Sequence, residues 1–294
     1  MTIQRVGVIG AGVIGAGVAQ DVATAGHSVV LLDISLDILE RAEQRIRTGL
    51  RTQRLLQKSC SLEPTSVITG RIQPTTDLAL LSTVEFIIEN VTEKWETKQR
   101  LYQSIDAICP DSCIFAANTS AIPITQIASA TKRGPLVIGV HFMNPPPLKS
   151  VVEVILGNHT SRDTLDRTKL FLSTLGKESV LVNDGPGFVA NRILMLTINE
   201  AIRVFHEGVA SVEAIDKIFK SCFGHKMGPL ETADLIGLDT VLYSIEVLEE
   251  SFGDSKYEPC PLLKTMVHDG LLGRKSGQGF YDYDANELQS AGNS

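Results

Sequence analysis

The chain has 294 residues and a formal net charge of −7, with 34 acidic against 27 basic residues. This length suits one large domain or two moderate ones, and the negative charge argues against a protein that binds nucleic acid through its phosphates. Hydrophobic residues make up 43% of the chain, but no uninterrupted apolar run reaches the roughly 18 residues of a membrane span, so no membrane partner is expected.

A cytoplasmic location is expected from the N-terminus and from the cysteines. The sequence enters a β-rich run at Ile3, which leaves no room for a cleavable signal sequence. The five cysteines are odd in number and lack metal-ligand spacing, as is usual for reduced thiols in a cytosolic protein. No metal is expected.

The most informative motif follows the first predicted strand, residues 3–9. It has the pattern Gly-x-Gly-x-x-Gly and opens an Ala-rich predicted helix at residues 13–25. The first glycine permits a tight turn, the second lets the backbone approach a pyrophosphate, and the third allows close packing of helix on strand. N–H groups at the positive end of the helix would bind the phosphates. The pattern predicts a dinucleotide site, rather than a turn without a ligand, at Gly10, Gly12, Val13, Ile14 and Gly15.

Asp33 indicates which dinucleotide binds. It ends the second predicted strand, residues 28–33, where a carboxylate can accept a hydrogen bond from a ribose 2′-hydroxyl. The same carboxylate would repel a 2′-phosphate, and no Arg or Lys occurs in residues 34–39 to attract one. The expected cofactor is therefore NAD rather than NADP.

A run of basic residues follows the second strand. Residues 44–58 contain five basic residues and no acidic one. Four of them would share one face of a helix, and we call these four the basic row: Arg47, Arg51, Arg54 and Lys58. The row is either a solvated helix face or a surface for a polyanion. That polyanion would be the phosphates of coenzyme A or the acidic surface of a carrier protein.

Short β-rich runs then alternate with helical patterns, which predicts a mostly parallel sheet wrapped by helices. The expected strands are residues 84–89, 113–117, 136–142, 151–156 and 179–182, and the expected helices are residues 93–108 and 162–175. Later patterns are all helical, at residues 188–207, 212–219, 240–252 and 261–268. We therefore expect an α/β, Rossmann-type domain at residues 1–183 and a helical domain at residues 184–294, with Pro186 suited to a helix start.

Three side chains near strand ends are candidates for chemistry. Ser120 follows one predicted strand and His141 closes the next, and the carboxyl ends of parallel strands share one edge of a sheet. Glu153, in the following strand, could reach the imidazole. Hydride transfer from an alcohol carbon needs a base for the hydroxyl proton, and a histidine held by a carboxylate can be that base. His141 is the best candidate among the six histidines.

Together these motifs resemble the 3-hydroxyacyl-CoA dehydrogenases over essentially the whole chain. The segments that carry the resemblance are residues 10–15, Glu89-x3-Glu93-x4-Lys98, residues 118–120 and 141–145, Glu153, residues 184–188 with Asn191-Arg192, residues 227–229 with Asp234, and residues 237–239 and 273–281. The resemblance implies an NAD-dependent dehydrogenase of 3-hydroxyacyl thioesters. It also implies a helical second domain that commonly mediates dimerisation, so a homodimer is expected.

The resemblance also implies roles for individual residues. His141 and Glu153 would be the catalytic pair, Ser120 would contact the substrate oxygen, and Asn191 would help to hold the reacting groups. The residues that would lie at the cofactor are Glu93, Lys98 and Asn118. Without the resemblance, Asn191 would be assigned to a helix face, and Glu93 with Lys98 to an exposed charged pair. The glycine-rich run at residues 273–279 would be a structural turn rather than a phosphate loop.

Two segments depart from the family pattern. Lys149 stands one position earlier than the usual lysine, which on an extended segment would turn its side chain to the other face. His225-Lys226 stands where an apolar residue or proline is more usual. Both segments should lie near the entrance for the acyl thioester.

These departures leave more than one substrate open. The alternative to acyl-CoA is a hydroxyacyl group tethered to an acyl carrier protein, as in the biosynthesis of methoxymalonyl-type polyketide extender units. The basic row would suit the acidic surface of such a carrier. A free hydroxy acid as substrate, and a non-catalytic NAD-binding protein, are further alternatives.

Overall fold

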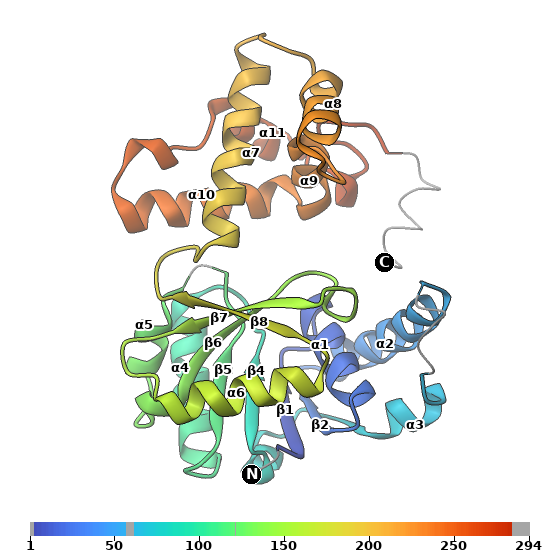
Figure 1. Cartoon of the computed structure of the whole chain (residues 1–294), viewed down its shortest axis with the longest axis vertical. Coiled ribbons are helices and arrows are strands. Elements are labelled where there is room, and N and C mark those ends of the chain that lie inside the picture. Colours follow the sequence, from blue (N-terminus) through green and yellow to red (C-terminus); the bar gives the residue numbers. More distant parts are fainter. Residues whose placement is uncertain (1–2, 57–61, 121, 284–294) are drawn as a thin grey trace. The chain divides into compact units, whose positions relative to one another are not determined.

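The computed structural model describes residues 3–56, 62–120 and 122–283 (Figure 1). The chain divides into two compact units, the first ending at Gly185 and the second beginning at Pro186. The first is an α/β unit built on one sheet, and the second is helical. This arrangement confirms the expected fold class.

The N-terminal unit contains an eight-stranded sheet in the order β3-β2-β1-β4-β5-β6-β7-β8. The strands are β1 (Arg5–Ile9), β2 (Ser28–Leu32), β3 (Ile72–Thr75), β4 (Phe86–Glu89), β5 (Ile114–Ala117), β6 (Val137–Phe142), β7 (Val151–Leu156) and β8 (Glu178–Asn183). Neighbouring strands pair in parallel, except that β6 and β7 are antiparallel. Each strand expected from the sequence is present, and its first and last residues lie within two positions of those expected. The polar strand β3 was not expected, since its apolar pattern is weak.

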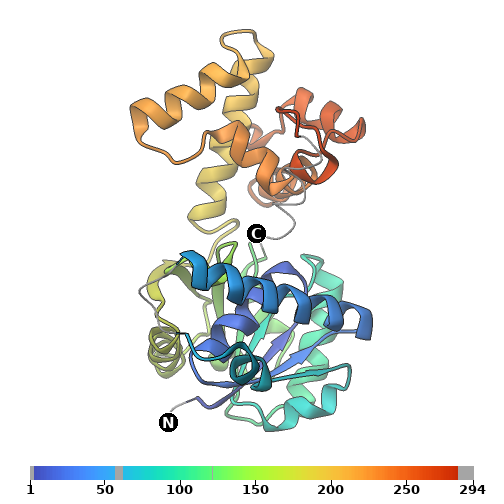
Figure 2. The ribbon, with the colours of Figure 1, turned by 90° about the vertical axis from the view of Figure 1, so that its right-hand side faces the viewer.

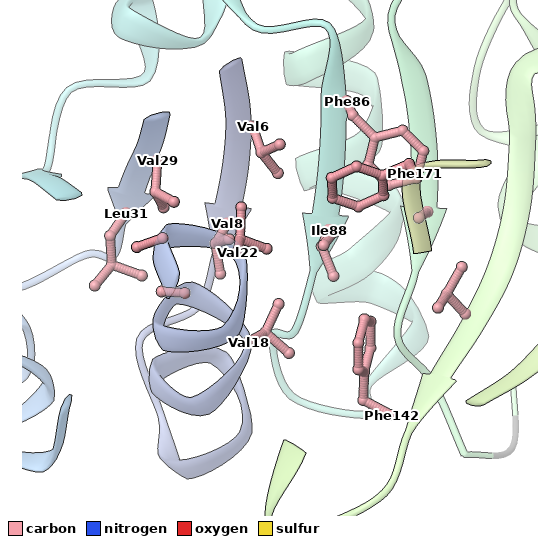
Figure 3. Close-up of a cluster of buried hydrophobic side chains, with 14 of the residues drawn as sticks. Val6, Val8, Val18, Val22, Val29, Leu31, Phe86, Ile88, Phe142 and Phe171 are labelled. Carbon is pink, nitrogen blue, oxygen red and sulfur yellow. The ribbon is translucent and has the colours of Figure 1, made fainter. Parts of the chain in front are cut away.

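Helices cover both faces of the sheet. The helices of this unit are α1 (Val13–Thr24), α2 (Leu36–Leu56), α3 (Thr65–Gly70), α4 (Trp95–Ile108), α5 (Ile124–Ser129) and α6 (Arg162–Thr174). On one face, Val18 and Val22 of α1 pack in the same core cluster as Phe171 of α6 (Figure 3). On the other face, Tyr102 of α4 lies against Phe115 of β5, with ring centroids 6.0 Å apart. Central strands buried on both faces explain the nearly continuous apolar runs in the sequence.

Helix α2 lies along α1 (Figure 2). It is amphipathic, and its buried side includes Leu39, Ile46 and Leu50. A hydrogen bond of 3.0 Å between the buried amides of Gln20 and Gln53 links the two helices. The apolar side of α2 therefore fixes its position beside the helix that follows the glycine motif.

The C-terminal unit consists of α7 (Ala190–His206), α8 (Val212–Phe223), α9 (Pro229–Ile236), α10 (Leu238–Phe252) and α11 (Pro261–His268), which pack around one core. Buried Asp216 accepts hydrogen bonds from the backbone N–H groups of Leu230 and Glu231 and so caps α9. Asp234 accepts from the N–H groups of Phe280 and Tyr281. Through these two bonds Asp234 holds the backbone of the turn at residues 273–281.

The expected helix start at Pro186 is wrong. Helix α7 begins at Ala190, because Gly187 (φ +72°) and Phe188 (φ +49°) adopt left-handed conformations that a right-handed helix cannot contain. Among the helices that the structure describes, none has both the length and the apolar character that crossing a bilayer requires.

Candidate active site

The glycine motif forms the turn between β1 and α1. Gly10 has φ +88°, a conformation that favours glycine, and a Cβ on Gly15 would lie only 1.7 Å from the carbonyl oxygen of Gly10. Around Gly12, by contrast, an added Cβ would meet nothing within 4 Å. No side chain caps α1, since its N-cap is Gly12, so the first N–H groups of the helix are available to an anion. Val13, which follows, is 52% exposed, and Ile14 is partly buried beside it. The turn has the features that a bound pyrophosphate requires.

Asp33 lies immediately beyond β2, at the same edge of the sheet. Its Oδ2 accepts a hydrogen bond of 2.6 Å from the N–H of Ala11, and its Oδ1 accepts one of 2.7 Å from the N–H of Ile34. The carboxylate thus braces the glycine turn. Each carboxylate oxygen has two lone pairs, so it can still accept from a ribose hydroxyl.

Ser120, His141 and Glu153 form a continuous hydrogen-bonded line. Ser120 Oγ lies 3.1 Å from His141 Nε2, and His141 Nδ1 lies 2.8 Å from Glu153 Oε2. His141 and Glu153 are 8% and 6% exposed. Because an ionised carboxylate only accepts hydrogen bonds, Nδ1 carries the ring hydrogen and Nε2 is left as the acceptor.

Strand pairing explains why the histidine and the glutamate meet. In the antiparallel pair of β6 and β7, His141 stands directly opposite Glu153, and Phe142 stands opposite Val152. Side chains on a strand alternate between faces, so opposite residues share a face. Phe142 packs into the core with α1 (Figure 3), and the His–Glu pair therefore lies on the other side of the sheet.

Asn118 links three strand ends. Its Nδ2 donates to Asn90 Oδ1 at 2.7 Å, and its Oδ1 accepts from the N–H of Phe142 at 3.0 Å. Asn90 in turn donates to the carbonyl of Ile88 at 3.0 Å. The carboxyl ends of β4, β5 and β6 are thereby held together beside the glycine turn, at the point where ligands bind in open α/β sheets.

Lys98 is not half of an exposed charged pair, so the expectation from the sequence alone is wrong. Its side chain is fully buried and its Nζ lies 2.8 and 2.9 Å from the two carboxylate oxygens of Glu89, also fully buried. Glu93 Oε2 lies farther away, at 3.6 Å from Nζ. Burial raises the pKa of Glu89, and the charge of Lys98 opposes this rise.

Glu93 instead holds the segment that carries the serine. Its carboxylate accepts from Thr119 Oγ1 at 2.7 Å and from the N–H of Ser120. Its side chain is 26% exposed. Sequence reasoning gave no role to Glu89, the buried partner of Lys98. The signal that could have indicated this pairing is an acidic residue at the end of an apolar strand, nine positions before a lysine.

The basic row is only partly a free surface. Arg47 forms an ion pair of 2.7 Å with Glu43, and Arg54 donates to Thr65 Oγ1 at 2.7 Å and to the carbonyl of Glu63. Arg51 is exposed. Lys58 lies outside the described residues.

Two other expectations concern Lys149, which follows β6, and Asn191, which follows β8. The argument that an extended segment turns the Lys149 side chain to the other face is wrong, because residues Pro146–Leu148 form a 3-10 turn. Asn191 lies in the first turn of α7, in the C-terminal unit.

Within the described residues, no group of three or more His, Cys, Asp or Glu side chains could hold a metal ion.

Both units of the chain match models of one protein family. Residues 5–185 match the NAD binding domain of 3-hydroxyacyl-CoA dehydrogenase, and residues 187–283 match its C-terminal domain. The chain belongs to the 3-hydroxyacyl-CoA dehydrogenase family. NAD is its cofactor, and it is an oxidoreductase that acts on CH–OH groups rather than a non-catalytic NAD-binding protein.

Individual family members are similar over nearly the whole chain. The 3-hydroxybutyryl-CoA dehydrogenase of Bradyrhizobium diazoefficiens is 45% identical, with 96% of each chain covered. The mitochondrial hydroxyacyl-coenzyme A dehydrogenase of Homo sapiens is 37% identical, with 96% of this chain and 91% of that one covered. The crystal structure of (S)-3-hydroxybutyryl-CoA dehydrogenase from Ralstonia eutropha matches with a TM-score of 0.89 and 40% identity, over 96% of this chain and 100% of that one.

Proposed function

We propose that the chain interconverts 3-hydroxyacyl-CoA and 3-oxoacyl-CoA, with short acyl groups such as 3-hydroxybutyryl as substrates. The observation that carries the proposal is the line from Ser120 through His141 to Glu153, at the strand edge that also bears the glycine turn. The names of the similar dehydrogenases support the choice of substrate.

In the proposed reaction His141 is the general base for oxidation. Its Nε2 takes the proton of the substrate hydroxyl, and Glu153 stabilises the imidazolium that forms. Ser120 Oγ, 3.1 Å from Nε2, donates to the same substrate oxygen and so holds it near the base. In reduction the charged imidazole returns the proton to the oxygen. The role of Asn191 in holding the reacting groups remains a prediction from the family resemblance.

The residues present fit NAD. The uncapped start of α1 and the open space at Gly12 would hold the pyrophosphate, and Asp33 would accept from a ribose hydroxyl. Glu93, which holds the N–H of Ser120, and Asn118, which holds the N–H of Phe142, would lie at the nicotinamide. Lys98 would support them from the interior through Glu89. The chemistry that bound NAD would supply is a hydride acceptor for the alcohol carbon.

An acyl carrier protein is the alternative source of the thioester. The exposed Arg51 and Lys149 would favour it. Arg47 and Arg54 of the basic row have intramolecular partners, so fewer charges of the row are available to a polyanion of either kind, the phosphates of coenzyme A or a carrier. A homodimer and a cytoplasmic location are the corresponding proposals for assembly and compartment.

The proposal is tested by following NADH consumption with acetoacetyl-CoA, and with the same acyl group on an acyl carrier protein. We expect strong turnover of the CoA thioester. Turnover on the carrier alone would replace the proposed substrate with the tethered one. Inactivity with both, in a protein that binds NADH, would contradict a thioester substrate and favour a free hydroxy acid.

A further inference from the structure

A second buried lysine lies near the catalytic strands. Lys177 immediately precedes β8, and its side chain is 5% exposed. Its Nζ donates to the carbonyl oxygens of Pro146 and Lys149, both at 2.7 Å, and lies 2.7 Å from Asp21 Oδ2. An ammonium group has three N–H donors, and these three oxygens surround it with two hydrogen bonds and an ion pair.

The three partners belong to two functional segments. Asp21 is on α1, whose uncapped first turn would hold the cofactor phosphates. Pro146 and Lys149 are in the loop of residues 143–150 that joins β6 to β7. The same loop touches α1 directly, since a Cβ on Gly17 would come within 2.8 Å of the Pro146 ring.

The loop is close in the chain to the proposed catalytic pair. His141 is the next-to-last residue of β6 and Glu153 the third residue of β7, so both side chains stand within a few residues of the loop ends. A buried charge costs several kcal/mol unless it is well paired. The Lys177 charge is buried between α1 and the loop of residues 143–150, where an apolar side chain could fill the same space. This burial points to a need for fixed geometry between α1 and the loop.

We propose that Lys177 is a positioning residue for the dehydrogenase reaction. By holding the loop of residues 143–150 against α1, it sets the distance between the cofactor, which α1 positions, and the His141–Glu153 pair on the strands that the loop joins. This inference rests on the proposed role of His141.

The test compares Lys177→Met with two other variants. K177M removes all three N–H donors, whereas Asp21→Asn leaves Lys177 bound to both loop carbonyls. The matched control is Arg133→Met. Arg133 is also buried, pairs with Asp106 at 2.6 Å and donates to the carbonyl of Pro110 at 2.6 Å, but it precedes β6 and so lies at the opposite edge of the sheet.

We expect K177M to lower kcat by about 10- to 100-fold, the scale of a small misplacement of reacting groups, with the Kd of NADH little changed. D21N, which replaces the ion pair between Lys177 and α1 with a neutral contact, should lower kcat in the same direction but by less than K177M does. R133M should keep kcat within about twofold at temperatures where it is folded. Unchanged kcat in K177M, or an equal loss of kcat in R133M, would overturn the proposal. If K177M does not fold, Lys177→Gln, which keeps an N–H donor on a shorter side chain, is measured instead and is expected to lower kcat while R133M does not.

A second measurement is independent of turnover. In NMR spectra of protein with labelled histidine, the ring signal of His141 is assigned by its absence in His141→Gln. We expect this signal to shift in K177M and to stay in place in R133M. An unshifted signal would contradict the positioning role even if the substrate proposed above proved wrong, so the two failures can be told apart.

Discussion

Glu153 accepts from Nδ1 of His141 at 2.8 Å, and this contact determines which ring nitrogen is left to take a proton. The position of Ser120 beside Nε2 is set in turn by Glu93, which holds the Thr119–Ser120 segment through both side-chain and backbone donors. Single side chains at this edge of the sheet therefore act as a connected group rather than as independent contacts.

The first prediction concerns His141. In His141→Gln the side chain keeps hydrogen-bonding groups but cannot accept a proton at neutral pH. We expect kcat to fall by roughly 10²–10⁴-fold, the range of lost acid–base catalysis, while NADH binding, measured by fluorescence titration, is retained. Near-normal kcat would exclude His141 as the base.

A second prediction concerns the pH dependence of stability. Burial raises the pKa of Asp21 from 3.8 to about 6, against the opposing effect of Lys177. The folded protein therefore binds this proton more tightly than the unfolded chain. The resulting stabilisation is fully present below pH 3.8 and is lost as the pH rises through about 6.

Asp21→Asn removes this titration. We expect the free energy of unfolding of the wild type, measured relative to D21N by urea denaturation, to fall by up to about 3 kcal/mol between pH 4 and pH 7. A difference between the two proteins that stays constant over this range would show that Asp21 does not titrate in this way.

At the scale of elements, the turn between β1 and α1 separates two roles that glycine can have. Gly15 is required by the fold itself, because a Cβ there would collide with the carbonyl oxygen of Gly10. Gly12 is not: its φ is −65°, and a Cβ there would meet open space. Only the bound cofactor would need a glycine at this second position.

These two glycines give a matched pair of variants. Gly15→Ala should lower the unfolding free energy by about 1–3 kcal/mol, as other overpacked sites do. Gly12→Ala should leave that free energy unchanged or slightly higher but weaken NADH binding. Thermal unfolding and NADH titration of both variants measure this. Loss of stability in G12A with full affinity for NADH would reverse the assignment.

The β6–β7 hairpin is the other element on which the proposed function depends. All other neighbouring strands pair in parallel, and this antiparallel pair alone sets His141 opposite Glu153. If a helical crossover joined β6 to β7, the two strands would be parallel, and this pairing of His141 with Glu153 would be lost. The alternation of residue types predicted that both strands exist, but not their relative direction.

At the scale of the whole molecule, the two units have separate hydrophobic cores. The NAD-binding features lie in the N-terminal unit. We therefore expect NADH to stabilise that unit directly, by about 2.7 kcal/mol when its concentration is about 100 times its Kd.

Hydrogen exchange on the full chain measures this effect. Amides of β1, β2 and β4 should exchange about 100-fold more slowly with NADH at that concentration, whereas amides of α11, in the core of the C-terminal unit, should change much less. Equal slowing in both units would contradict separate stabilisation.

The sequence by itself determined the fold class, the cofactor and the family. These follow from local patterns, since glycine spacing, apolar periodicity and a strand-end aspartate each depend on residues close together in the chain. It also predicted Ser120 and His141 at neighbouring strand ends, with Glu153 in the following strand.

Only the tertiary structure decided which charged groups are buried and which residues they pair with. Lys98 pairs most closely with the buried Glu89, at 2.8 Å, and lies farther from Glu93, at 3.6 Å. Lys177 joins Asp21 to two loop carbonyls that lie 31 and 28 residues earlier in the chain. The physical reason is that a lysine looks the same in a sequence whether it is solvated or buried. Burial depends on which distant segments pack around it, and pairing depends on the oxygens that this packing brings within reach.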